Sequence, residues 1–408
     1  CASQTRLIDY TFSRAQDTKG QFGLYWAEPD HKQLSDLMRQ QFLADGGREA
    51  ERLVISTKRS WVNVAQEVEQ TVRSWALGPV LRRPFIGWIS SWNAKCGIAS
   101  SSEHLIEQLP ESVMVFAPRN VEQHGEDDAQ VVRCWDMTQD TLIDLNDALQ
   151  KYGINALMIQ FNYGFFEFSA FAAFLSTQVA RQVKIIVTLH STTDMNPDRQ
   201  LATLIPALTL CHRVLVHSTA DLNRLKELGL TDNVALFPLG VKDVPVVSLQ
   251  PKKIGSTLSR RSGSTSFLIA TYGFFLPHKG LMEIVDAISL LRAEGCNVML
   301  NMINAEYPID ESAALIHQVQ TKINEMGLSK YIRLTTRFLA DEESLAHMRL
   351  ADLIVYPYQE TGESASAAVR FGLASMRPVA VTPLAIFDDV GCAVFRLPGF
   401  TPAKLAQG

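Results

Sequence analysis

Short apolar runs alternate with helical patterns in two successive blocks of this chain, and that alternation is the strongest constraint on its fold. The strand-like runs of the first block lie at residues 85–89, 113–116, 156–160, 184–189 and 213–216, and those of the second at 267–272, 298–300, 332–334, 353–355 and 379–381. Runs of this kind between helices are typical of parallel strands buried on both faces. The sequence therefore predicts two α/β lobes, each built on a parallel sheet.

Composition separates the two lobes and sets apart the N-terminal part of the 408-residue chain. Residues 248–266 are rich in Ser, Lys, Arg and Gly, which suits an exposed linker between a first lobe at 84–247 and a second at 267–408. Residues 1–83 instead carry apolar side chains at helical spacing, at 34, 37, 38 and 42 and again between 61 and 72. We therefore predict a helical segment ahead of the two lobes.

The overall composition favours a soluble globular protein and argues against several other classes. The chain is 47% hydrophobic and 20% charged with a net charge of −5, so nothing global indicates a nucleic-acid partner. No apolar run reaches the roughly 18 residues that a membrane-spanning helix needs. The six cysteines are scattered without a Cys-x-x-Cys pair, which favours reduced thiols over a zinc site or a disulfide framework.

Polar residues and glycines follow the carboxyl ends of several predicted strands. Open α/β sheets bind ligands in the crevice outside those ends. Gly97 follows the first strand of the first lobe and His190 follows a later one, while Lys279 and Glu363 follow two strands of the second lobe. Helices begin after Gly97 and Lys279, and helix N-termini favour anions such as a diphosphate. These positions predict a ligand-binding cleft between the lobes.

The loop at 271–280 reads Thr-Tyr-Gly-Phe-Phe-Leu-Pro-His-Lys-Gly. It resembles the Gly-Arg-Leu…Lys-Gly loop of the retaining glycosyltransferases of family 4, which have the GT-B fold of two Rossmann-like lobes around a central cleft. In that family the Arg and the Lys bind the donor diphosphate. The resemblance implies donor binding by Gly273 and Lys279. Phe274 stands at the position of the Arg, so one phosphate cation is missing.

The segment at 356–371 resembles the Glu-x7-Glu motif of the same family. There the first Glu contacts hydroxyls of the transferred sugar and the second contacts the nucleotide ribose. Glu363 matches the first position, and the resemblance implies a catalytic role for it. Phe371 stands at the second position, and Glu360 is the nearby substitute. Backbone N–H groups at the start of the next helix are also expected to face the donor, at Ser364, Ala365 and Ser366.

Three further resemblances and placements concern the first lobe. His190 resembles the family's His at the tip of a strand beside the reacting sugar, which implies a second catalytic residue. The loop with Gly97 resembles the family's glycine loop, whose backbone approaches the donor phosphate or the acceptor. Asn162 follows another strand end and Asp194 follows His190 on the same loop, and we place both on the acceptor side of the cleft.

Two absent motifs shape the expectation about metal ions. The chain has no Asp-x-Asp, with which fold-A glycosyltransferases commonly hold a metal, and no Gly-x-x-x-x-Gly-Lys-Ser/Thr phosphate loop. In a GT-B enzyme Lys279 and the helix dipoles can carry the charge of the leaving diphosphate. We therefore predict no metal site and no cofactor, with the nucleotide sugar as a substrate.

The resemblance implies a retaining hexosyltransferase that moves a sugar from a nucleotide-sugar donor to a glycan or lipid-linked glycan acceptor. Mannose is the preferred donor sugar, by resemblance to tandem mannosyltransferases that build bacterial surface polysaccharides such as lipopolysaccharide. Such an enzyme is expected in the cytoplasm, with peripheral association at the inner face of the membrane. Residues 1–83 resemble the closing helices of an upstream domain, and the chain from Cys1 to Gly408 reads as a fragment of a longer polypeptide.

Two alternatives stay open at this point. One is a non-catalytic nucleotide- or glycan-binding module with the same fold, which the missing Arg and the missing second Glu would favour. The other is a nucleotide-sugar 2-epimerase on the same fold. An epimerase needs several acid–base carboxylates and histidines around its cleft, and the sequence offers few.

Overall fold

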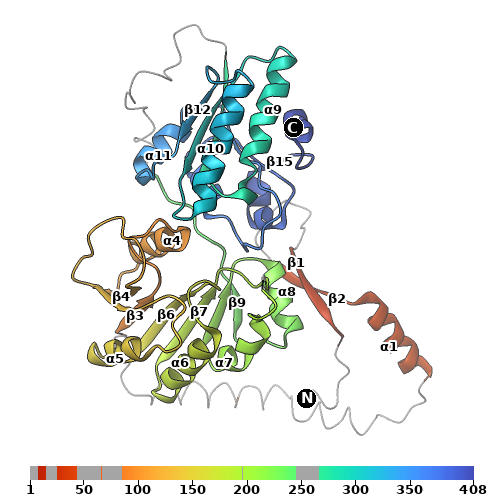
Figure 1. Cartoon of the computed structure of the whole chain (residues 1–408). Coiled ribbons are helices and arrows are strands. Elements are labelled where there is room, and N and C mark those ends of the chain that lie inside the picture. The colour runs from red at the N-terminus through yellow and green to blue at the C-terminus, as the bar shows by residue number, and fades with distance from the viewer. Residues whose placement is uncertain (1–7, 15–24, 44–65, 67–84, 195, 245–265) are drawn as a thin grey trace. The chain divides into compact units, whose positions relative to one another are not determined.

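The computed structural model describes residues 8–14, 25–43, 66, 85–194, 196–244 and 266–408. The chain divides into two compact units, Cys1–Pro84 and Phe85–Gly408. Figure 1 shows the elements of both units along the chain.

The described part of the first unit combines a hairpin with a helix. Strands β1 (Tyr10–Arg14) and β2 (Tyr25–Pro29) pair antiparallel, and α1 (His31–Leu43) follows. The helix confirms the pattern at 34–42, and the hairpin ahead of it was not predicted. Period-two alternation explains the difference, since the rings of Tyr10 and Phe12 meet edge to face at 5.4 Å. The second helical pattern, between 61 and 72, lies outside the described residues but for Gln66, which is helical.

The first lobe of the second unit is built on a seven-stranded, all-parallel sheet in the order β5-β4-β3-β6-β7-β8-β9. Its strands are β3 (Ile86–Ile89), β4 (Val113–Pro118), β5 (Val131–Trp135), β6 (Ala156–Phe161), β7 (Lys184–Leu189), β8 (Arg213–Val216) and β9 (Val234–Leu236). Its helices are α4 (Gly97–Ile106), α5 (Ile143–Lys151), α6 (Phe168–Ala180), α7 (Ile205–Thr209) and α8 (Thr219–Glu227), with the short η1 (Leu201–Leu204) before α7. The five predicted strands of this lobe are confirmed.

Stacked aromatic side chains form much of the core of the first lobe. Trp135 stacks on Phe166 with ring centroids 4.9 Å apart, and Phe166 stacks on Phe171 at 4.7 Å. Phe161, the last residue of β6, packs on Phe171 at 5.1 Å, and all four rings are at most 1% exposed. This packing holds the carboxyl end of β6 rigidly.

The second lobe is built on a six-stranded parallel sheet in the order β12-β11-β10-β13-β14-β15. Its strands are β10 (Phe267–Phe274), β11 (Val298–Ala305), β12 (Ile332–Thr335), β13 (Leu353–Tyr356), β14 (Val379–Val381) and β15 (Phe395–Arg396). Its helices are α9 (Leu281–Ala293), α10 (Asp310–Glu325), α11 (Asp341–Met348), α12 (Ala367–Ala374) and α13 (Pro402–Gln407), with 3-10 turns η3 (Pro277–Lys279) and η4 (Ala385–Ala393). The five strands predicted here are confirmed as well.

Two apolar clusters cover the two faces of the second sheet. One face packs against α9, α10 and α13 through residues such as Ile284, Val319 and Leu405. The other packs against α11 and α12 through residues such as Leu345 and Val369. In Figure 1 α9 and α10 lie side by side over the sheet. Burial on both faces explains the near-continuous apolar runs of these strands.

The three strands of the second unit that the sequence did not predict, β5, β9 and β15, lie at sheet edges. Strand β5 carries Arg133 at its centre, where the guanidinium pairs with Asp127 at 2.6 Å, and three of its five residues are only partly buried. Strand β15 has two residues, and both are exposed. Edge strands need no apolar run, because one side of the ladder is unpaired and solvent reaches it.

Strand order reverses once in each sheet, and these points locate the ligand crevice. In the first lobe the reversal falls between β3 and β6, and in the second lobe between β10 and β13. Ligands of open α/β sheets bind outside the carboxyl ends of the strands at such points. The loops that follow these four strands carry Gly97, Asn162, Lys279 and Glu363. Four of the predicted site residues therefore follow the strands that border the two reversals.

Candidate active site

Lys279 and Glu363 form an ion pair at the ends of β10 and β13. The Lys279 ammonium lies 2.9 Å from Oε2 of Glu363, and Nε2 of His278 lies 3.5 Å from Oε1 of the same carboxylate. Lys279 also lies over the ring of Tyr358, with Nζ 4.0 Å from the ring centroid. The residue is 7% exposed, so this cation is held between a carboxylate and a π face and not solvated.

The charges of this pair are set by its neighbours. Burial alone would raise the pKa of Glu363, but Lys279 and then His278 outweigh it and hold the pKa at about 2. The side chain of Glu363 keeps 44% of its surface exposed, so the cationic neighbour and not deep burial decides its charge. Burial acts to lower the pKa of Lys279, yet Tyr358 and Glu363 raise it above its ordinary value. Both groups are ionised at neutral pH.

Gly280 allows the Lys279 loop to lie against the loop after β13. Its φ is +67°, a left-handed conformation, and a Cβ there would stand 1.8 Å from the carbonyl oxygen of Pro357. Only glycine fits both conditions. Helix α9 then begins at Leu281, as the sequence predicted. No side chain caps the free N–H groups of the first turn of α9, because the N-cap residue is Gly280. Gly273, also predicted as a donor residue, has φ +134° at the end of β10.

His190 lies at the end of β7 in a hydrogen-bonded chain. Its Nε2 lies 2.8 Å from the side-chain amide of Gln160, and its Nδ1 lies 3.3 Å from Nε2 of His217. Nδ1 of His217 donates to the carbonyl of Phe237 at 2.8 Å. Burial and the neighbouring His217 lower the pKa of His190 well below its ordinary value. Burial lowers the pKa of His217 too, although the carbonyl of Phe237 acts in the opposite direction. Both imidazoles are therefore neutral at pH 7.

Hydrogen bonds join the His190 loop to the Glu363 loop across the cleft. Ser191 Oγ donates to the carbonyl of Gly362 at 2.8 Å, and the N–H of Ser364 donates to the carbonyl of His190 at 3.4 Å. The two predicted catalytic residues therefore lie on loops that touch each other, although they come from different lobes and are 173 positions apart in the chain.

Asp221 is a site residue that the sequence analysis missed. Its carboxylate is 4% exposed and accepts hydrogen bonds from Thr192 Oγ1 at 2.6 Å and Ser218 Oγ at 2.6 Å in its own lobe. It also accepts from Ser364 Oγ in the second lobe, at 2.7 Å. Ser218 and Asp221 form the capping box of α8. That spacing, Ser-x-x-Asp before an apolar run, is the sequence signal for the helix start, but nothing local indicates the contact with Ser364.

The two aromatic departures from the family motifs both take part in contacts between aromatic rings. Phe274 stacks on Phe338 with centroids 5.9 Å apart, and Phe338 meets the ring of His124 in the first lobe at 4.8 Å. Phe371 lies 5.8 Å from the ring of His104, which is also in the first lobe. Aromatic rings thus line the interface of the two lobes at the positions where the family has a cation and a carboxylate.

The remaining predicted donor residues differ in how the structure uses them. Ser364 and Ser366 are buried, and Ser366 caps α12 by accepting from the N–H of Val369 at 3.3 Å. Ala365 lies between them and is partly buried, while Glu360 is exposed on the same loop. Of these four residues, Glu360 is the one whose side chain is exposed to solvent. The role of each toward a donor stays a prediction.

The two predicted acceptor-side residues are engaged in local structure. Asn162 Oδ1 accepts from the N–H of Gly164 at 2.9 Å, which is a turn contact. Asp194 accepts from Tyr163 Oη at 2.8 Å and from Arg224 at 3.1 Å. Burial alone would raise the pKa of Asp194, but these partners and the N–H of Leu201 lower it. Both side chains position their loops, and direct contact of either one with an acceptor stays a prediction.

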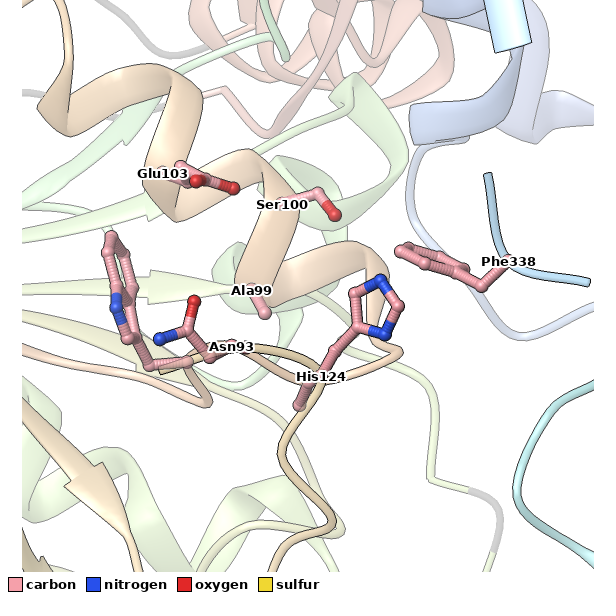
Figure 2. A pocket seen from close by; sticks show the side chains of 9 residues that line it. Asn93, Ala99, Ser100, Glu103, His124 and Phe338 are labelled. Atoms are coloured by element: carbon pink, nitrogen blue, oxygen red, sulfur yellow. The ribbon is translucent and has the colours of Figure 1, made fainter. Parts of the chain in front are cut away.

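Gly97 is the first residue of α4, next to a cavity. A Cβ on Gly97 would meet no atom within 4 Å, and Cys96 makes no side-chain cap to the helix, so the helix start is open. The cavity has a volume of about 150 Å³ and is shown in Figure 2. It is lined by Trp92, Asn93, Ala94, Ala99, Ser100, Glu103, His124 and Gly125 from the first lobe and by Phe338 from the second.

Two other features bear on the sequence predictions. Within the described residues, no group of three or more His, Cys, Asp or Glu side chains is placed to hold a metal ion. Among the helices that the structure describes, none has both the length and the apolar character needed to cross a membrane.

Comparison with solved structures identifies the fold. The chain resembles sucrose-phosphate synthase of Thermosynechococcus elongatus (TM-score 0.58, 14% identity, 80% of this chain and 88% of that one). It also resembles Anabaena HepE in complex with UDP (0.59, 12%, 79% and 88%) and the UDP-forming α,α-trehalose-phosphate synthase of Burkholderia xenovorans (0.60, 12%, 80% and 90%). The chain has the GT-B fold. No family model matches it, and a search of curated proteins found no match.

Proposed function

We propose that residues 85–408 transfer a sugar from a nucleotide-sugar donor to a glycan acceptor, with retention of anomeric configuration. The observation that carries the proposal is the ion pair of Lys279 and Glu363, which lies at the strand-order reversal of the second sheet and in contact with the loop of His190. Structures of the similar Anabaena HepE hold UDP and UDP-glucose, which supports a nucleotide-sugar donor for this chain.

The charge arrangement suits a departing diphosphate. A diphosphate that enters at the open start of α9 meets the Lys279 ammonium, which then exchanges its contact with Glu363 for a phosphate oxygen. Glu363 is released to accept hydrogen bonds from hydroxyls of the donor sugar. The positive charge is already in place before the bond breaks, so no reorganisation is needed as negative charge develops on the leaving group.

His190 supplies a neutral polar group on the opposite side of the same site. Its two ring nitrogens are engaged by Gln160 and His217, and its pKa is well below the ordinary value, so it lines the site without placing a second cation beside an oxocarbenium-like sugar. The protein then mainly holds donor and acceptor in position, and the acceptor hydroxyl attacks the face from which the diphosphate leaves. No protein nucleophile is required in this scheme.

The finer assignments extend this proposal. We propose that transfer needs no metal ion, since Lys279 and the helix start carry the charge. The donor sugar is proposed to be mannose and the product a surface polysaccharide, both from the family resemblance alone. Anabaena HepE has been solved with UDP, and the similar trehalose-phosphate synthase is UDP-forming, so a UDP-linked donor is the first alternative to test.

A second candidate function is a non-catalytic nucleotide- or glycan-binding module. The aromatic contacts of Phe274 and Phe371 favour it, because these rings occupy the places of a phosphate cation and a ribose-binding carboxylate. Losing two such groups weakens donor binding by about 1.5–3 kcal/mol for each contact to a charged group. The two candidates differ in turnover, which a binding module lacks.

The test is a transfer assay with UDP- and GDP-linked hexoses, a panel of glycan acceptors, and NMR assignment of the product anomer. Transfer with retention, in the presence of EDTA, is expected for the wild type. Glu363→Ala is expected to lower the rate at least tenfold, which corresponds to about 1.4 kcal/mol of transition-state stabilisation. Glu325→Ala, at the exposed end of α10, serves as the control.

Three outcomes would count against the proposal. An inverted product would refute retention, and a full rate in Glu363→Ala would refute the role of that carboxylate. Loss of activity in EDTA with recovery on adding Mg²⁺ or Mn²⁺ would refute the charge scheme built on Lys279. Donor binding without any turnover would favour the binding module.

A further inference from the structure

The cavity beside α4 is a candidate ligand site separate from the Lys279–Glu363 pair. Figure 2 shows Ala99 and Ser100 on one turn of α4 and Glu103 on the next, with Asn93 beneath them and the rings of His124 and Phe338 next to each other on one side. Lys279 and Glu363 do not line it. Since Phe338 comes from the second lobe, both lobes contribute to the lining of the cavity.

The size of the cavity matches one ring of a small molecule. Its volume is about 150 Å³, the scale of an engineered cavity that admits benzene. Pockets that enclose larger organic ligands usually measure about 300–1,000 Å³. A complete nucleotide sugar is therefore too large for it, whereas a single sugar ring is of the right order.

The polar groups of the cavity favour a ligand rich in hydrogen-bond donors. Both amide hydrogens of Asn93 are engaged, one with Asp127 at 2.7 Å and one with the carbonyl of Glu126 at 3.1 Å, so its Oδ1 is left to accept. Glu103 adds a carboxylate, which only accepts when it is ionised. The N–H of Ser100 is already bonded to the carbonyl of Cys96 at 3.2 Å and is not offered to a ligand.

The electrostatics of the cavity disfavour an anion. The nine lining residues include no Lys or Arg, and Glu103 is their one carboxylate. The nearby guanidinium of Arg133 is held by both carboxylate oxygens of Asp127, at 2.6 and 3.0 Å. Burial, and then the neighbouring Glu107, raise the pKa of Glu103, so this region already resists negative charge. A phosphate, which offers acceptors and negative charge, meets no Lys or Arg among these lining residues, and the carboxylate of Glu103 opposes it.

We propose that this cavity binds one uncharged sugar ring of the acceptor, through hydroxyl groups that donate to Asn93 and Glu103, and that it excludes sugar phosphates. The ring is held between apolar and aromatic side chains, as small ligands commonly are. The assignment of the ring to an acceptor rests on the proposed function. The similar trehalose-phosphate synthase of Burkholderia xenovorans has been solved with glucose-6-phosphate. Under our proposal this chain differs from that protein, because its cavity takes a sugar that carries no phosphate.

The test measures binding alone, without transfer, by saturation-transfer NMR and chemical-shift titration in the presence of UDP. The probes are the methyl glycosides of glucose, mannose and galactose, each against the corresponding hexose 6-phosphate. We expect at least one methyl glycoside to bind in the millimolar range and at least tenfold more tightly than its 6-phosphate. Because no transfer is measured, failure of the proposed function leaves this result interpretable.

Charge reversal in the cavity gives a second readout. Glu103→Lys is expected to invert the preference, with the 6-phosphate binding more tightly than the neutral glycoside. Glu111→Lys, at an exposed position beyond α4 and outside the lining, is expected to keep the wild-type preference. Thermal melting and UDP binding check that both variants are folded. Binding of none of the neutral glycosides, or equal or tighter binding of a 6-phosphate by the wild type, would overturn the proposal. An unchanged preference in Glu103→Lys would overturn the role of that residue.

Discussion

Replacing Lys279 by Met removes one cation from the candidate active site and keeps the length and most of the volume of the side chain. The variant deletes the 2.9 Å contact to Glu363 and the contact of the ammonium with the ring of Tyr358. It leaves Gly280 and the start of α9 unchanged. The substitution therefore separates the charge of Lys279 from its packing.

The two expected effects differ in size. A charge-assisted hydrogen bond to the departing diphosphate contributes about 1.5–3 kcal/mol, so the rate should fall roughly 10- to 150-fold. The effect on folding extends to smaller values, about 0.5–3 kcal/mol in total for the two lost contacts. Glu363 is 44% exposed and can be hydrated once its partner is gone, which limits the ion pair to at most about 1 kcal/mol. The lost cation–π contact adds about 0.5–2 kcal/mol.

The dependence of stability on pH gives an independent check of the pair. The pKa of Glu363 is about 2, below its ordinary value of 4.5. A lowered carboxyl pKa contributes stability that is fully present above the unfolded value and is lost as the pH falls through the folded value. In Lys279→Met the pKa should return toward the ordinary range. The stability difference between the variant and the wild type should then be constant above about pH 5 and shrink toward pH 2.

The assays are sugar-transfer kinetics, urea unfolding between pH 2 and 7, and an NMR titration of the Glu363 carboxyl carbon. Lys322→Met is the matched control, because Lys322 pairs with Asp286 at 2.6 Å between α10 and α9, away from the cleft. The control should lose stability but not activity. A rate within twofold of wild type in Lys279→Met, or an unchanged pKa of Glu363, would refute the reasoning.

Three further predictions concern the same loops and the buried histidines. Gly280→Ala should cost more than about 2 kcal/mol of unfolding free energy through its backbone clash, against about 1 kcal/mol for Gly229→Ala, whose Cβ meets no atom; equal melting temperatures for the two variants would contradict this. Phe274→Arg restores the family's cation, and calorimetry should show UDP binding about tenfold tighter; no gain would mean that other contacts already replace the charge. The pKa values of His190 and His217 are both lowered, so stability should decrease as the pH falls below about 6.5, where only the unfolded chain takes up protons; a flat profile in denaturant unfolding between pH 7 and 5 would argue against two neutral imidazoles.

The sequence indicated the elements well wherever burial on both faces left a simple pattern. Strands such as β7 and β8 carry apolar runs whose ends match the observed bounds, because both faces of each sheet are covered. Strand β5 was missed because an edge strand tolerates Arg133 at its centre. The hairpin in the first unit was missed because its alternation spans only five residues in each strand. The places of Lys279 and Glu363 could be predicted because each lies in the segment that follows the end of a strand, and their roles stay predictions.

The sequence by itself determined which residues follow the carboxyl ends of the parallel strands, where the crevice is expected. A strand end can be recognised from the local sequence pattern alone. Only the tertiary structure decided which of those residues meet. The contact of Ser364 with Asp221, the pair of His190 and His217, and the rings of Phe274 and Phe338 join segments that are 27 to 143 positions apart. Such contacts depend on strand order and on the closure of two lobes, which no local pattern encodes. Whether a carboxylate such as Glu363 is free or bound to a lysine is therefore fixed by packing and not by its motif.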